Sequence, residues 1–315
     1  MPDVTETKTE AAADAVAAPS AADGKSKEKP RSLWGDAWFD LRHRPMFWIS
    51  SILLLALLIV AAFPGLFTGA DPRDGDLTNH FLTKPELGHF FQPDWFGYDG
   101  QGRSIYARVI YGTRASILVG VGVTAAVTLV GGLLGMLAGY FGGWLDSVIS
   151  RVTDIFFGIP FLLGAMVVLN AFTDRKVYVV ILALAFLGWT SICRVMRASV
   201  ITAKQADYVT AARALGAGTP RILFRHVLPN ALAPTIVVAT IALGGYISAE
   251  ATLSFLGLGL GEPTISWGID IAQGSQDIRD NPHALLFPAG MLSLTVFAFI
   301  MLGDAVRDAL DPKLR

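Results

Sequence analysis

Six long apolar runs constrain this chain more than any other feature of its sequence. A helix needs about 20 apolar residues to cross the ~30 Å hydrocarbon core of a bilayer, and within it every backbone polar group is satisfied internally. The runs lie at residues 47–67, 115–139, 154–172, 177–196, 232–256 and 284–303. The composition agrees, since 53% of the 315 residues are hydrophobic, 16% are charged and the mean hydropathy is +0.51. We therefore expect an all-α, polytopic membrane protein with six transmembrane helices.

The regions around these runs differ in character along the chain. Residues 1–30 are rich in Ala, Lys, Glu, Asp and Pro and lack aromatic side chains, which predicts a disordered cytoplasmic tail. Residues 31–46 contain tryptophans and are expected to form a cytoplasmic interfacial segment. Residues 47–315 are expected to form the transmembrane domain, which includes a cytoplasmic loop at 199–230. The single cysteine, Cys193, lies in an apolar run and is expected to be a packing residue.

Lys and Arg are distributed unevenly among the segments that connect the runs. With the N-terminus inside, 17 of the 25 Lys and Arg residues fall on the inner side and eight on the outer side. Cytoplasmic loops of membrane proteins retain such positive charge. We therefore predict that both termini are cytoplasmic and that the loops at 68–114 and 257–283 are external. The segment at 208–234 then faces the compartment that contains ATP.

The segment between the fourth and fifth runs, "YVTAARALGAGTPRILFRHVLPNALAP" at 208–234, is polar and carries three arginines and a histidine. Residues 199–215 predict a helix that leaves the membrane along its interface. The glycines that follow are suited to end this helix, because glycine readily adopts the left-handed conformation of helix ends. Thr219 is then a natural N-cap with Pro220 at the first helical position, and Pro229 is expected to close this second short helix.

Part of this segment matches a known pattern. "TAARALGAGTPRILFRHVLP" at 210–229 resembles the cytoplasmic loop of ABC importer permeases, whose pattern is Glu-Ala-Ala, three residues, Gly, nine residues, and then a residue two before Leu-Pro. Thr210 stands where the family often has Glu, and His226 stands where the pattern has Ile. The positions in register are Ala211, Ala212, Gly216, Leu228 and Pro229.

Three further stretches narrow the resemblance to the dipeptide, oligopeptide and nickel branch of these permeases, and to its C-type subunit. They are "FGYDGQGRSIYARVIYGTRASILVG" at 96–120, "EATLSFLGLGLGEPTISWG" at 250–268 and "LGDAVRDALDPKLR" at 302–315. The first stretch departs from the family at Tyr98, where Thr is usual, and at Ser104, where Asp is usual.

The resemblance implies a type I importer permease fold in the bacterial inner or plasma membrane. It implies ATP-driven import of peptides, with nickel or another small solute as the alternative cargo. The partners would be a second permease subunit, two ABC ATPase subunits or domains, an extracytoplasmic substrate-binding protein and membrane lipid. This chain would need no cofactor, because the ATPase subunits would bind ATP and Mg. The loop residues implied to couple to the ATPase are Thr210, Ala211, Ala212, Leu215, Gly216, Ala217, Gly218, Thr219, Pro220, His226, Leu228 and Pro229.

Other functions have less support. "ADGKSK" at 22–27 ends like a phosphate-binding loop, but position 19 is Pro where that loop needs Gly, so we expect no ATPase site. The net charge of −1 argues against nucleic acid binding. An intramembrane enzyme would need a nucleophile or metal motif within its spans, and the sequence contains none. A secondary transporter would be expected to show internal repeats or paired intramembrane charges, and neither is found here. A loop that merely lies on anionic lipid is the simplest alternative for the segment at 208–234.

Three acidic side chains lie at or near membrane depth, where ionised groups are costly and often functional. Glu250 is a candidate for the translocation pathway. Asp154 and Asp304 are instead expected to pair with the nearby Arg151 and Arg307 at the ends of their spans.

Aromatic residues and histidines complete the sequence predictions. Trp189 and Trp267 are expected to be anchors at the membrane interface. His80, His89 and His283 are scattered over the predicted outer loops without metal-ligand spacing and are expected to be ordinary surface residues. No metal site is predicted.

Overall fold

The described part of the chain is built almost entirely from helices. The computed structural model describes residues 33–310, so the predicted tail at 1–30 and residues 311–315 lie outside it. Within these bounds, strand-type contacts are limited to two isolated bridges, and the predicted all-α class is confirmed. The elements are α1 (Leu33–Arg42), α2 (Pro45–Ala62), η1 (Pro64–Leu66), α3 (Ile105–Phe141), α4 (Gly143–Phe157), α5 (Phe161–Asn170), α6 (Val177–Lys204), α7 (Asp207–Ala214), α8 (Thr219–Ile222), η2 (Leu223–Val227), α9 (Leu228–Phe255), α10 (Trp267–Gly274) and α11 (His283–Leu310).

Five helices of the described part are long and apolar enough to cross a membrane. They are α2, α3, α6, α11 and the continuous helix Thr219–Phe255, which contains α9. The predicted span at 154–172 is instead divided between α4 and α5, which are bent by 86°. Ile159 lies at this bend and precedes Pro160, and a residue before proline is disfavoured in helical conformation. The predicted sixth span therefore exists only as this bent pair.

α3 and α6 approach each other closely because α3 presents a glycine to α6 at every fourth residue. An ideal Cβ added at Gly131 would lie 2.3 Å from the carbonyl oxygen of Trp189. One at Gly135 would lie 2.3 Å from the carbonyl oxygen of Cys193. Small residues at such spacing allow helix backbones to approach in a membrane, where close packing holds helices together. Cys193 is buried in this contact, which confirms its predicted packing role.

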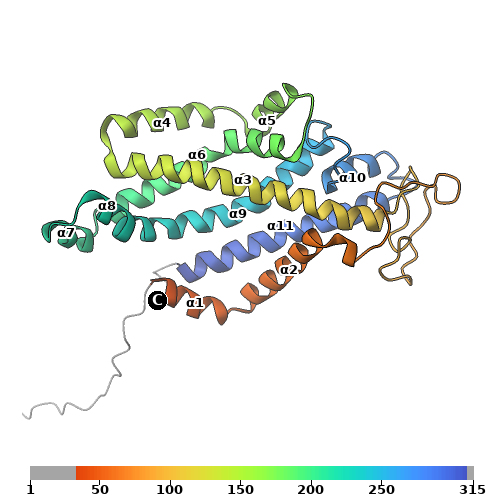
Figure 1. Ribbon diagram of the computed structural model, residues 1–315, viewed down its shortest axis with the longest axis horizontal. Coiled ribbons are helices and arrows are strands. Elements are labelled where there is room, and N and C mark those ends of the chain that lie inside the picture. Colours follow the sequence, from red (N-terminus) through yellow and green to blue (C-terminus); the bar gives the residue numbers. More distant parts are fainter. Residues whose placement is uncertain (1–32, 311–315) are drawn as a thin grey trace, which may run out of the picture. The chain divides into compact units, whose positions relative to one another are not determined.

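The long helices separate two ends of the bundle (Figure 1). α1, α7, α8 and the end of α11 lie at one end, whereas α10 and the loops that precede α3 lie at the other. Arg44 before α2 forms a 2.6 Å ion pair with Asp308 near the end of α11. The first and last described helices are therefore on the same side as the segment at 208–234, as the predicted topology requires. We call the end with α10 the outer end.

The predicted ion pairs of the two acidic residues at span ends do not form. Asp154 pairs with Arg194 at 2.7 Å rather than with Arg151, because α4 packs alongside α6 and brings these side chains together. Asp304 is exposed and has no ion-pair partner among residues 33–310, so the expected contact with Arg307 is wrong.

The two tryptophans expected at the membrane interface lie in the core. Trp267 is fully buried, and its Nε1 donates a hydrogen bond to the carbonyl oxygen of Val109 at 3.0 Å. Trp189 is only 8% exposed. Both predictions are wrong. Trp189 lies in the middle of α6, where its ring contacts Phe156 of α4, and Trp267 begins α10, which is not one of the membrane-crossing helices. The sequence alone does not distinguish such packed positions from interfacial ones.

Candidate functional site

The segment at 205–230, which we call the elbow, is a helical projection between α6 and α9 (Figure 1). α6 ends at Lys204, whose Nζ donates to the carbonyl oxygens of Gly139 at 3.1 Å and Tyr140 at 2.9 Å. These oxygens lie at the end of α3, where helical carbonyls lack partners and a cation is favoured. The base of the elbow is therefore fixed to the ends of α3 and α6.

A break after α6 corrects the predicted continuous helix over 199–215. Ala206 takes an extended conformation with ψ of 146°, and α7 begins at Asp207. This turn allows Val209 to be fully buried in an apolar cluster with Met196 and Val200 of α6. The elbow is consequently anchored by apolar packing as well as by its backbone.

The turn after α7 follows the prediction for Gly216. The N–H of Gly216 donates to Arg213 and that of Ala217 to Ala212, both at 3.0 Å, which is the hydrogen-bond pattern of a Schellman motif. Gly216 has φ of +81°, a conformation that side chains with a Cβ rarely adopt. A Cβ at this position would contact no atom within 4 Å, so the backbone conformation alone requires glycine.

The second helix of the elbow begins one residue earlier than predicted. Gly218 is the N-cap, and its carbonyl oxygen accepts a hydrogen bond from the N–H of Ile222 at 3.0 Å. Thr219 is the first helical residue and makes no side-chain cap. Pro220 follows it within the first turn, where a missing N–H costs no hydrogen bond.

Pro229 does not close this helix, contrary to the prediction. The chain continues through a π-turn at Leu223–Val227 directly into α9, and the N–H of Leu228 donates to Leu223 five residues back. In a regular α-helix the ring of Pro229 would clash with the carbonyl group four residues earlier. The wider π-turn relieves this clash. The helix Thr219–Phe255 is therefore one element of 37 residues that begins in the elbow.

The outward surface of the elbow combines apolar and basic side chains. Leu215 is 88% exposed, Phe224 is 61% exposed and Tyr208 is 44% exposed. Three exposed arginines lack an ion-pair partner within the described range: Arg213, Arg221 and Arg225. Large apolar groups beside unpaired guanidinium groups are typical of a surface that another protein covers.

Most of the predicted coupling residues lie on or beside this surface. The exposed ones are Thr210, Ala211, Leu215, Gly216, Gly218, Thr219 and Pro220, and the half-buried ones are Ala212, Ala217, His226, Leu228 and Pro229. Tyr208 and Phe224 were not among the predicted site residues. Phe224 could have been found from its neighbours, because Arg221 and Arg225 place polar groups on its side of the helix.

Glu250 lies near the outer end of the same helix and is fully buried. Its Oε1 accepts a hydrogen bond from Ser254 at 2.7 Å, and its Oε2 accepts one from Ser116 of α3 at 3.3 Å. The hydroxyl oxygens of these serines in turn accept from the N–H groups of Leu260 at 3.0 Å and Trp267 at 3.4 Å. One carboxyl group thus joins α9, α3 and the segment that leads into α10. Its complete burial favours this connecting role, and a place in the translocation pathway remains a prediction.

A cavity of about 670 Å³ opens between the α4–α5 bend, α6 and α9. Phe157 and Pro160 contribute to its apolar wall at the bend. Its hydroxyl-bearing lining residues are Thr190, Ser191, Tyr246, Ser248 and Thr252. Neutral hydroxyl groups on an apolar wall can hydrogen-bond a polar solute without holding it by charge. This cavity is therefore a better candidate for a pathway surface than Glu250.

One histidine of the outer loops has acidic neighbours that could also act as metal ligands. His89 Nδ1 lies 2.6 Å from Asp94 Oδ2 and 3.9 Å from Glu86 Oε2. The hydrogen bond with Asp94 and the charge of that carboxylate raise the pKa of His89 above its usual value. His89 is therefore not an isolated surface residue. The three side chains are at least partly exposed, and an ion pair accounts for their arrangement.

Together, an elbow at one end, long apolar helices and an apolar cavity with several hydroxyl groups are the features expected of the membrane-spanning subunit of a transporter. Residues 131–315 match the family described as "Binding-protein-dependent transport system inner membrane component". Residues 32–85 match the "N-terminal TM domain of oligopeptide transport permease C". The chain belongs to this family of ABC importer permeases, and specifically to its C-type subunits, which confirms the predicted resemblance.

Relatives of the chain match it over nearly its whole length. It is 36% identical over 291 residues to the oligopeptide transport system permease protein OppC of Bacillus subtilis, covering 92% of this chain and 93% of that protein. It is 35% identical over 284 residues to the dipeptide transport system permease protein DppC of Alkalihalophilus pseudofirmus, covering 90% and 91%. It is 35% identical over 288 residues to the glutathione transport system permease protein GsiD of Escherichia coli, covering 91% and 93%.

Family membership settles several predictions at once. The protein is a multi-pass inner-membrane protein with the type I permease fold, and it is a transport subunit. This decides against the secondary transporter and the intramembrane enzyme, which are different classes of membrane protein.

Proposed function

We propose that this chain is the C-type permease subunit of an ATP-driven peptide importer and that its elbow is the docking site for an ATPase subunit. The observation that carries this proposal is the continuous helix Thr219–Phe255. At one end this helix holds exposed Phe224 beside unpaired arginines, and near the other it holds buried Glu250. A rigid helix of 37 residues, about 55 Å long, is suited to carry movement of the elbow across the membrane.

The assembly follows from what this chain does not supply itself. We infer that two ABC ATPase subunits or domains bind ATP and Mg, because the sequence has no phosphate-binding loop. A second permease subunit would complete the pathway on the open side of the cavity between the α4–α5 bend, α6 and α9. An extracytoplasmic substrate-binding protein would deliver cargo to the outer end. Both chain termini and the elbow would then be cytoplasmic, in keeping with the distribution of Lys and Arg.

Peptides are the proposed cargo. The named relatives carry oligopeptides, dipeptides and glutathione, and all three are molecules with peptide bonds. The hydroxyl groups that line the cavity can donate to and accept from peptide groups, and this chain contributes no charged side chain to that lining. Nickel or another small solute is the alternative cargo.

The proposal is tested by reconstituting the chain with its second permease subunit, ATPases and binding protein in proteoliposomes. We expect ATP-dependent uptake of a labelled peptide that unlabelled peptide inhibits and Ni²⁺ does not. The chain purified alone should hydrolyse no ATP. Uptake without ATPase subunits, or ATP hydrolysis by the isolated chain, would contradict the assignment. Inhibition of uptake by Ni²⁺ but not by unlabelled peptide would indicate nickel as the cargo.

A further inference from the structure

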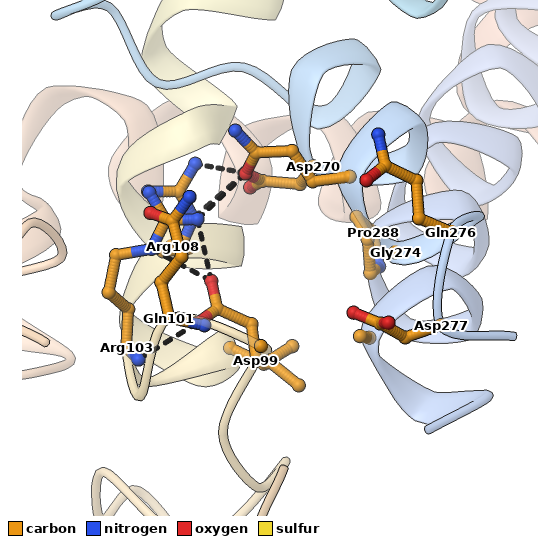
Figure 2. A pocket seen from close by; sticks show the side chains of 13 residues that line it. Asp99, Gln101, Arg103, Arg108, Asp270, Gly274, Gln276, Asp277 and Pro288 are labelled. Carbon is orange, nitrogen blue, oxygen red and sulfur yellow. Dashed lines mark hydrogen bonds and ion pairs between the residues drawn. The ribbon is translucent and has the colours of Figure 1, made fainter. Parts of the chain in front are cut away.

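A small polar cavity lies at the outer end of the bundle. It has a volume of about 170 Å³ and opens between the turn before α3 and the segment from α10 to the beginning of α11. Figure 2 shows Asp99, Asp270 and Asp277 around a common space, with Arg103 and Arg108 at one side. These five charged side chains give the lining an excess of one negative charge.

Both arginines of this lining are already paired. Arg108 Nε donates to Asp270 Oδ1 at 2.8 Å. Arg103 Nε donates to Asp99 Oδ2 at 2.8 Å, and its Nη2 donates to Gln273 Oε1 at 2.7 Å. Both positive charges of the lining are therefore paired with Asp270 and Asp99, which also line the cavity.

Two carboxylates retain unused acceptor oxygens. The Asp270 side chain is only 7% exposed, and its Oδ2 has no hydrogen-bond partner. Asp277 also lines the cavity, is half-buried and has no ion-pair partner among the described residues. A buried acceptor without a donor is unfavourable, so a bound group that donates hydrogen bonds here would be stabilised.

The group that fits best is a primary ammonium. It carries one positive charge and three N–H donors, which matches the excess negative charge and the two unused acceptors. The cavity is too small for a peptide chain but large enough for the end of a lysine side chain. It lies at the outer end, where the beginnings of α3 and α11 meet α10 and the turn before α3, and a soluble protein can reach this end of the bundle.

The surrounding surface favours a basic partner. Residues 68–104 contain six Asp and Glu against three Lys and Arg, and residues 257–283 contain four against one. Opposite charges on two proteins accelerate their association and orient them. We propose that the cavity at Asp270 and Asp277 receives a lysine side chain of the substrate-binding protein when it docks. This inference rests on the proposed assembly and adds the chemistry of the docking contact.

The test compares Asp277→Asn with Asp280→Asn in the complete transporter held in nanodiscs. Asp280 is exposed three residues away and does not line the cavity, so its substitution removes the same charge from the same loop. We expect Asp277→Asn to weaken binding of the binding protein by about tenfold and to lower its salt dependence. Asp280→Asn should change the affinity by less than about twofold.

A second measurement identifies the partner group directly. A carbodiimide joins a carboxylate to a neighbouring lysine amine without a spacer, and mass spectrometry of the docked complex should find Asp277 joined to one lysine of the binding protein. Replacing that lysine with Gln should weaken docking as much as Asp277→Asn does. The two changes together should weaken docking no further than either alone.

The outcomes separate this inference from the proposed function. If wild-type transporter binds the binding protein and hydrolyses ATP but Asp277→Asn and Asp280→Asn behave alike, the cavity does not receive a lysine. If Asp277→Asn alters uptake of a peptide with a free amino group but not of its acetylated form, and docking is unchanged, the cavity serves the substrate and the proposal is wrong. If no binding protein associates with the wild-type complex, the proposed function itself fails.

Discussion

Arg108 and Asp270 lie 162 positions apart in the sequence and form an ion pair in which both side chains are at least nine-tenths buried. This contact holds α10 against the beginning of α3. Removing one partner of a buried pair leaves a charge in a place with little water, which costs about 3–5 kcal/mol. We therefore expect Arg108→Ala to lower the melting temperature of the purified complex strongly.

An exposed ion pair provides the control for this prediction. Arg44 and Asp308 are 35% and 50% exposed at their side chains. Such pairs contribute about 0–1 kcal/mol, so Asp308→Ala should leave the melting temperature almost unchanged. Equal effects of Arg108→Ala and Asp308→Ala, measured by intrinsic fluorescence during heating, would show that the buried pair does not hold α10.

The hydrogen bonds of Glu250 lead to a second prediction. Glu250→Gln keeps one acceptor for Ser254 and places an amide donor beside the hydroxyl oxygen of Ser116. Glu250→Ala leaves these hydroxyl groups without their acceptor and creates a cavity, at a cost of about 1–3 kcal/mol for each unsatisfied group. Hydrogen exchange should therefore become faster at the backbone N–H groups of Leu260 and Trp267 in Glu250→Ala and remain slow in Glu250→Gln. Unchanged exchange in both variants would contradict the connecting role of this carboxyl group.

Topology is the subject of a third prediction. Residues 200–230 should be cytoplasmic and residues 68–112 external, as the distribution of Lys and Arg indicates. In a background with Cys193→Ala, single cysteines at Thr219 and Asp76 should react with a membrane-impermeant reagent from opposite sides of sealed vesicles. Both positions are in exposed or half-exposed segments, so access depends on the side of the membrane. Labelling of both from outside intact cells would overturn this topology.

Some features could be predicted from the sequence because they depend on local composition. Apolar length identified most of the membrane-crossing helices, and the glycines after Leu215 indicated the turn at Gly216, which the structure confirms. The bend before Pro160 has the same kind of local cause, yet a long apolar run concealed it. Such features follow from lengths and from the allowed backbone conformations of Gly and Pro.

Other features depend on contacts between distant parts of the chain. Pro229 can continue a helix only because the π-turn before it is held by buried Leu223 and Val227. Asp154 pairs with Arg194, forty positions away, rather than with an arginine of its own helix. The outer cavity could not be predicted, since its walls come from segments far apart in the sequence. Tertiary packing decides each of these cases.

The turn at Gly216 leads to a fourth prediction. Gly216→Val forces a β-branched residue into positive φ at a cost of about 1–3 kcal/mol, although its side chain would meet no neighbour. The change should displace α7 relative to the helix after Thr219 without preventing membrane insertion. We expect normal membrane abundance, loss of peptide uptake, and ATP hydrolysis that is either lost or no longer coupled to transport.

The control for Gly216→Val is the same substitution at a glycine that does not need positive φ. Gly290 in α11 is exposed, has no positive φ and would also place a Cβ in open space. Gly290→Val should therefore keep transport near the wild-type rate. Normal transport by Gly216→Val would show that the angle of the elbow does not matter for coupling.

The last prediction decides whether the elbow binds a protein or only lies on lipid. Phe224 is 61% exposed beside unpaired Arg221 and Arg225, so shortening its side chain should change the stability of this chain little. If it fills a groove of the ATPase, Phe224→Ala should weaken binding of that subunit by roughly 10- to 30-fold, as expected for an aromatic anchor at an interface. Phe141 at the end of α3 is 57% exposed and lies outside the elbow, so Phe141→Ala should bind the ATPase normally. Interferometry on nanodisc-held permease measures both affinities. Equal affinities for wild type, Phe224→Ala and Phe141→Ala would mean that the elbow surface is covered by lipid, because a lipid contact would leave the ATPase affinity unchanged.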